Sequence, residues 1–144
     1  MAAGDRVFSL RKATFGADVA DVVYASIADQ AVKITDPGDA AAPGIAEIQI
    51  THRSKSVTVY GFNRNALRAL YGAAAAALVL GTLGLAGALE KCTLKKVFFG
   101  DPVGEFTIQR PDQPGTVTLW GIRGECIWAA ADTDALMEVW AADA

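Results

Sequence analysis

Alternating apolar and polar residues indicate β-strands along the first 60 residues. The pattern is clearest in IAEIQITHRSKSVTVYGF, residues 45–62, where Ile48 and Ile50, and later Val57 and Val59, alternate with polar neighbours. A period of two is typical of a strand with one buried and one exposed face. The polar RSKS between the two runs predicts a hairpin turn. RVFSL, DVVYASI and AVKIT predict earlier strands, and DPGDAAAPG, residues 36–44, predicts a loop.

The period changes at Asn63. Asn63 or Asn65 can cap a helix, because a short amide side chain satisfies backbone N–H groups at a helix start. The following ALRALYGAAAAALVL is rich in strong helix formers. We therefore expect one α-helix over about residues 64–80. Its core-facing residues would be Leu67, Leu70, Tyr71 and Leu78.

Strand patterns return in the last third of the chain. KCTLKKVFFG, GEFTIQR and TVTLWGIRGECIWAA predict strands, separated by the turn sequences GDPVG and RPDQPG. Within the last strand, Gly121 and Gly124 predict a bulge or a close backbone approach. The tail DTDALMEVWAADA predicts a short helix capped by Asp132, with Leu136 and Trp140 on one face.

Together these elements predict a single α+β domain over residues 1–144. It is mainly an antiparallel β-sandwich or β-barrel with one central packed α-helix. The 144 residues, 52% of them hydrophobic, are enough for a sizeable core. The net charge of −3 and the absence of a basic patch argue against tight nucleic-acid binding. The start of the sequence lacks a signal-peptide pattern, so we expect synthesis in the cytoplasm.

Residues 69–89 contain no charged side chain and allow three interpretations. Their length suits a transmembrane helix. However, much of the stretch is alanine and glycine, which contribute little to membrane insertion. A thin alanine-rich helix can instead pack on the chain's own strands or on sister subunits. Packing against protein is therefore favoured over a membrane anchor.

No constellation of residues indicates catalysis. His52 is the single histidine, and no nucleophile with an acidic partner stands near it in the sequence. Cys92 and Cys126 lack CxxC spacing, and a metal site would require them to converge with His52 and a carboxylate. GTLGLAG lacks the residues of a phosphate-binding loop. We expect a non-enzymatic protein without catalytic, cofactor-binding or metal-binding residues. The three tryptophans, Trp120, Trp128 and Trp140, would be core or interface anchors.

Three features carry a resemblance to a known family. They are the hairpin IQITHRSKSVTVYGF, the helix beginning near Asn63, and the returning strands CTLKKVFF, EFTIQR and TVTLWGIRGECIW. In length and in this architecture the chain resembles the small tail-tube proteins of bacteriophages and related injection systems. The alanine-rich helix departs from that family.

The resemblance implies a virion structural subunit that is synthesised in the host cytoplasm and contacts other virion proteins. In that family such subunits form hexameric rings whose sheets join into an inner barrel, and DNA passes through it without specific binding. A loop, here residues 36–44, meets the next ring. The alternatives are a capsid decoration or head–tail joining protein, and a small membrane-anchored protein that uses residues 69–89.

Overall fold

The computed structural model describes residues 6–38, 43–83 and 89–143 of the chain. In chain order the elements are β1 (Arg6–Phe15), β2 (Ala17–Asp18), β3 (Val22–Gly38), β4 (Pro43–Gly61), α1 (Arg64–Arg68), β5 (Ala76–Leu83), β6 (Leu89–Phe98), β7 (Gly104–Gln109), β8 (Thr116–Cys126), α2 (Asp134–Met137) and β9 (Glu138–Ala142). The predicted, mainly antiparallel β fold is therefore confirmed.

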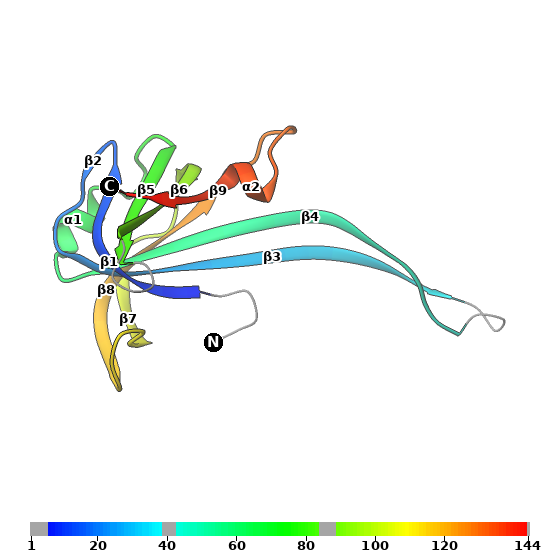
Figure 1. Cartoon of the computed structure of the whole chain (residues 1–144), viewed down its shortest axis with the longest axis horizontal. Helices are drawn as coiled ribbons and strands as arrows, with labels where there is room; N and C mark the ends of the chain where they lie inside the picture. The colour runs from blue at the N-terminus through cyan, green and yellow to red at the C-terminus, as the bar shows by residue number, and fades with distance from the viewer. Residues whose placement is uncertain (1–5, 39–42, 84–88, 144) are drawn as a thin grey trace.

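The described strands form one nine-stranded sheet with antiparallel pairings. The order is β7-β8-β4-β3-β1-β5-β6-β9, and β2 pairs with β1. An additional pairing joins β8 to β6, so the path β8-β4-β3-β1-β5-β6 returns to its first strand. Strands β7 and β9 lie outside this ring. The β3–β4 hairpin extends far beyond the other strands (Figure 1).

The predicted turn at RSKS is wrong, because β4 runs without interruption from Pro43 to Gly61. Ser54 and Ser56 pair across the sheet with Gln30 and Ala28 of β3, so this polar stretch continues the ladder. The connection between β3 and β4 falls on residues 39–42, which lie outside the described residues. The predicted loop at 36–44 is therefore too wide, since β3 ends at Gly38 and β4 begins at Pro43.

The predicted helix over residues 64–80 begins where expected but ends far too late. Asn63 is the N-cap, and its side-chain oxygen accepts a hydrogen bond from the Ala66 N–H at 3.1 Å. The helix ends at Arg68, and Gly72 adopts a φ of +72°, a conformation that suits glycine and turns the chain away. The Gly72 N–H donates a hydrogen bond to the Phe99 carbonyl at 2.9 Å.

The alanine-rich segment after Gly72 forms β5, which lies between β1 and β6. Leu78 and Leu80 are fully buried there. Position 81 requires a glycine, because a Cβ there would come within 2.7 Å of the Lys12 side chain. Pairing with two neighbouring strands and burial of the leucines thus outweigh the helix propensity of the alanines.

At the C-terminal end the predictions are partly confirmed. Strand β8 pairs with β4 in unbroken register, so the bulge at Gly121 or Gly124 is wrong. The close approach is confirmed, because an added Cβ would lie 2.7 Å from Phe106 at Gly121 and 2.8 Å from Phe99 at Gly124. The short tail helix exists as α2, but Trp140 lies in β9, opposite Cys92.

The main core collects fully buried side chains from almost every element of the ring. Phe99 and Met137 join it from segments that flank the strands. Its largest fully buried members are Phe99, Ile27, Leu67, Leu78, Leu80, Leu94, Ile122 and Met137. A second, smaller cluster of Tyr24, Tyr60 and Leu119 packs against Phe106 and Ile108 of β7. The buried Leu67 and Leu70 anchor α1 on this body, as predicted, whereas Tyr71 is exposed.

Candidate assembly surfaces

The outer part of the β3–β4 hairpin stands apart from the rest of the sheet. Among the described residues, β3 pairs with β1 only through residues 24–27, and β4 pairs with β8 only through residues 56–61. Beyond these points the described residues of β3 and β4 pair only with each other. Figure 1 shows this two-stranded ribbon reaching away from the body. An isolated two-stranded ribbon is marginally stable in water, so this one is suited to a partner surface.

His52 lies in this ribbon, opposite Val32 and next to a register shift between Val32 and Lys33. Its side chain is outside the described part of the structure. Cys92 and Cys126 are both buried. Among the described residues, no three His, Cys, Asp or Glu side chains gather in a way that could hold a metal ion.

The root of the hairpin contains a buried lysine. Lys55 is only 4% exposed, and its ammonium contacts Asp29 of β3 and Glu138 of β9, the latter at 2.9 Å. Glu138 also accepts a hydrogen bond from the Trp140 indole N–H at 2.6 Å. Burial disfavours the charged ammonium, but the hydrogen bonds to Asp29 and Glu138 outweigh this and raise the pKa of Lys55. We call Lys55, Asp29 and Glu138 the Lys55 triad. It links β9 to the base of the β3–β4 hairpin.

The charges of the Lys55 triad act on the thiol of Cys126. Burial raises the pKa of its thiol to about 11, and the nearby Lys55 charge only partly opposes that effect. A protonated, buried thiol is a poor nucleophile, because the thiolate is the reactive form. Cys126 is consequently a packing residue.

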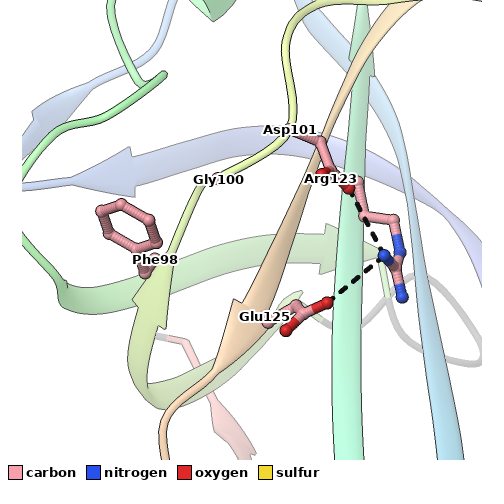
Figure 2. Close-up of a pocket in the computed structure, with 5 residues that line it drawn as sticks. All are labelled: Phe98, Gly100, Asp101, Arg123 and Glu125. Atoms are coloured by element: carbon pink, nitrogen blue, oxygen red, sulfur yellow. Dashed lines mark hydrogen bonds and ion pairs between the residues drawn. The ribbon is translucent and has the colours of Figure 1, made fainter.

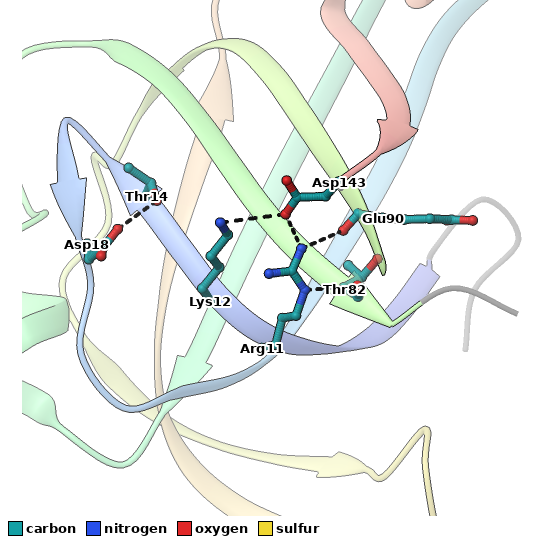
Figure 3. A network of polar contacts seen from close by, with 7 residues as sticks. All are labelled: Arg11, Lys12, Thr14, Asp18, Thr82, Glu90 and Asp143. Carbon is teal, nitrogen blue, oxygen red and sulfur yellow. Dashed lines mark hydrogen bonds and ion pairs between the residues drawn. The ribbon is translucent and has the colours of Figure 1, made fainter. Parts of the chain in front are cut away.

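A second polar network holds the C-terminal end of the chain (Figure 3). Arg11 of β1 makes an ion pair with Asp143, and Lys12 approaches the same carboxylate at 3.5 Å. Arg11 also donates to the backbone carbonyls of Thr82 and Glu90. The hydrogen bond from Arg11 lowers the pKa of Asp143 below its usual value. This clasp joins β1, β5, β6 and the segment after β9.

A small pocket of about 230 Å³ opens beside β8 and the turn after β6. Figure 2 shows Arg123 between Asp101 and Glu125, with Phe98 and Gly100 completing the wall. Arg123 reaches both carboxylates at 3.4 Å. The three side chains are exposed, the single arginine is shared by two carboxylates, and the described lining includes no nucleophile. The pocket therefore offers no catalytic arrangement.

Two strand edges complete the candidate surfaces. Within the described sheet, β7 pairs only with β8 and β9 only with β6, so each presents a row of backbone groups to the outside. The segment through α2 and β9 also exposes three large apolar side chains, namely Leu136 at 52%, Val139 at 43% and Trp140 at 40%. An exposed, apolar edge strand is a common site of association with another chain.

The comparisons with known proteins identify no family. No protein-family model matches the chain, and no curated protein matches its sequence. The described ranges contain no helix that is long and apolar enough to cross a bilayer. Within residues 69–89, the segment that would form a membrane anchor, Ala76–Leu83 is instead β5, a strand of the sheet.

The buried triad was missed in the sequence, although a signal for it exists. Lys55 precedes Val57 and Val59 at alternate positions of the strand, which places all three on the same, buried face of β4. A lysine on a buried face requires an acidic partner. The clasp between Arg11 and Asp143 has no such signal, because the two residues are 132 positions apart.

Proposed function

We propose that this protein is a non-enzymatic virion structural subunit that assembles with copies of itself into rings or a tube, as tail-tube proteins do. The observation that carries the proposal is the β3–β4 ribbon, whose outer part extends from the body with no described pairing to other strands. A ribbon of this kind gains stability when another subunit covers it.

The remaining architecture supports the same proposal. The closed path of pairings is a β-barrel in this interpretation, with α1 packed at one end. The outward edges of β7 and β9 would pair with neighbouring subunits, which removes the hazard of open strand edges. The net charge of −3 fits a channel that repels DNA phosphates and lets DNA pass without binding.

Assembly of the purified protein tests the proposal directly. Negative-stain microscopy and sedimentation velocity should show rings or tubes of the wild-type chain. A matched variant joins Ala31 to Arg53 through Asn-Gly and so omits the outer ribbon. These two residues are cross-strand partners, so a two-residue turn fits between them. This variant should keep the circular dichroism of the folded body and remain monomeric.

Two results would contradict the proposal. A wild-type protein that stays monomeric at high concentration would exclude a self-assembling tube. Equal assembly of the wild-type and shortened chains would show that the ribbon is not the assembly element.

A further inference from the structure

An open cavity lies where the end of β7 meets the first residues of β1. Its volume is about 620 Å³, and its described lining is Val7 of β1 and Ile108, Gln109, Arg110 and Pro111 at and just after the end of β7. Small-molecule sites have volumes of about 300–1,000 Å³ and combine apolar walls with a few polar groups. Val7, Ile108 and Pro111 supply aliphatic walls, and Arg110 supplies a positive charge. The cavity therefore suits a ligand with an apolar part and an anionic group.

The turn after β7 holds Arg110 in place. The Arg110 N–H donates a hydrogen bond to the Gly115 carbonyl at 3.0 Å, which closes the turn between β7 and β8. Gly115 has a φ of +101°, a conformation that glycine adopts readily. Asp112, within the turn, accepts a hydrogen bond from the Tyr24 hydroxyl of β3 at 3.0 Å. The turn is therefore attached to β3, the strand that pairs with β1.

The Arg110 guanidinium lacks a counterion in the part of the chain that the structure describes. The side chain is half-buried, and its Nε is buried without a hydrogen-bond partner there. Asp112 is the acidic residue of the turn, but its carboxylate is engaged by Tyr24 and forms no described ion pair with Arg110. Burial and the hydrogen bond to Asp112 raise the pKa of Tyr24, and the Arg110 charge is close enough to oppose this effect. Arginine stays charged in proteins, so a partly buried, unpaired guanidinium favours an anionic ligand.

We propose that the cavity binds a small aliphatic carboxylate, whose carboxylate contacts Arg110 and whose hydrocarbon chain lies along Val7, Ile108 and Pro111. A guanidinium presents parallel N–H donors that match a carboxylate. A single arginine suits one negative charge better than the roughly two charges of a phosphate group at pH 7. The described walls contain no aromatic ring, which favours an alkyl chain over a stacked ring. This site is independent of the proposed assembly.

Isothermal titration calorimetry with matched ligands tests the site. Octanoate should bind to the wild type, whereas octylammonium, which has the same chain and the opposite charge, should not bind at the same concentrations. Hexanoate should bind about tenfold more weakly than octanoate, because each buried CH₂ contributes about fourfold to the affinity. These comparisons separate recognition of the carboxylate from unspecific apolar contact.

Variants of the turn test the role of Arg110. Arg110→Gln should weaken octanoate binding by about tenfold or more, because it removes a charge-assisted contact. The turn should still close, since the hydrogen bond to Gly115 comes from the backbone, and circular dichroism checks the fold. Asp112→Asn should tighten octanoate binding by about two- to threefold, because a nearby repelling charge is lost. The amide oxygen can still accept from Tyr24.

Arg123→Gln is the matched control. Its guanidinium lies in the other pocket and is already shared by Asp101 and Glu125. This variant loses the same charge as Arg110→Gln, and its affinity for octanoate should equal that of the wild type.

Three results would overturn the inference. They are no binding of octanoate to the wild type, equal affinities for octanoate and octylammonium, and equal effects of Arg110→Gln and Arg123→Gln. If Arg110→Gln does not fold, Arg110→Lys takes its place, because lysine keeps the charge without the paired donors. It should bind octanoate more weakly than the wild type and still reject octylammonium. An affinity equal to that of the wild type would also overturn the contact with Arg110.

Discussion

At the scale of single residues, buried charge is the feature with the largest expected effect. Lys55 is almost fully covered, and Glu138 beside it is only 7% exposed. Replacing Lys55 with Met leaves Glu138 without this counterion. Breaking a buried ion pair in this way costs several kcal/mol, and we expect a loss of about 3 kcal/mol in the free energy of unfolding. Urea denaturation measures it.

Arg123 provides the control for Lys55, because both partners of its ion pair with Asp101 are exposed. Arg123→Met should cost less than about 1 kcal/mol. Equal losses for the two variants would mean that the Lys55 triad contributes no more than a surface pair.

Gly121 and Gly104 form a matched pair of glycines, since they lie opposite each other in β7 and β8. A Cβ at Gly121 would come within 2.7 Å of Phe106 and 2.9 Å of Tyr60, whereas at Gly104 the nearest atom is 3.9 Å away. Gly121→Ala should therefore lower the free energy of unfolding by about 1–3 kcal/mol. Gly104→Ala should cost much less, and thermal denaturation of both variants would reveal a wrong ranking.

Alkaline pH should destabilise the protein through Cys126. The pKa of this thiol is raised from 9.0 to about 11 in the folded chain, so the unfolded chain loses its proton first. Stability should fall as the pH rises from about 9 to about 11. The raised pKa of Lys55 acts in the same direction at the upper end, because its contribution is lost when the ammonium deprotonates.

Thermal unfolding of the wild type and Cys126→Ala at several pH values tests this prediction. The decline between about pH 9 and pH 11 should be shallower in the variant. Parallel declines would show that another group is responsible.

At the scale of elements, β5 shows where sequence reasoning succeeds and fails. The start of α1 was predictable because Asn63 makes a local contact with Ala66. The strand conformation of the alanine-rich segment was not predictable, because β5 is stabilised by pairing with β1. Strand β1 precedes β5 by about 70 residues, and Leu10, for example, lies opposite Thr82. The same holds for β4, where the polar RSKS looked like a turn but is satisfied by β3. Local signals were reliable where a local contact satisfies them, as at Asn63, and failed where contacts distant in sequence overrode them.

Val79 in β5 offers a test of strand against helix. In a strand, the order of stability should be Val79, then Val79→Thr, then Val79→Ala, because β-branched residues are favoured. In a helix, alanine would be the best of the three. We expect Val79→Ala to lose about 1 kcal/mol in chemical denaturation. A gain in stability for Val79→Ala would contradict the assignment of β5.

At the scale of the whole molecule, α1 and the end of the β3–β4 hairpin lie at opposite ends of the long axis (Figure 1). If charged contacts hold the proposed assembly together, added salt should weaken it, because screening shortens the range of the attraction. The protein concentration required for assembly should rise several-fold when NaCl increases from about 0.05 M to about 0.5 M. Sedimentation velocity at both concentrations measures the shift, and a rise in assembly with salt would indicate mainly apolar contacts.

The position of β1 between β3 and β5 has a consequence for the order of folding during synthesis. The β3–β4 hairpin joins neighbours in sequence and can form as soon as residue 61 has left the ribosome. The pairing of β1 with β5 must wait for β5 to emerge, β8 pairs with β6 later, and the pairing of β9 with β6 comes last. A nascent chain therefore displays its long ribbon before the rest of the sheet is complete. On polysomes, where such chains are crowded, chaperones that shield extended strands would be needed most during this interval.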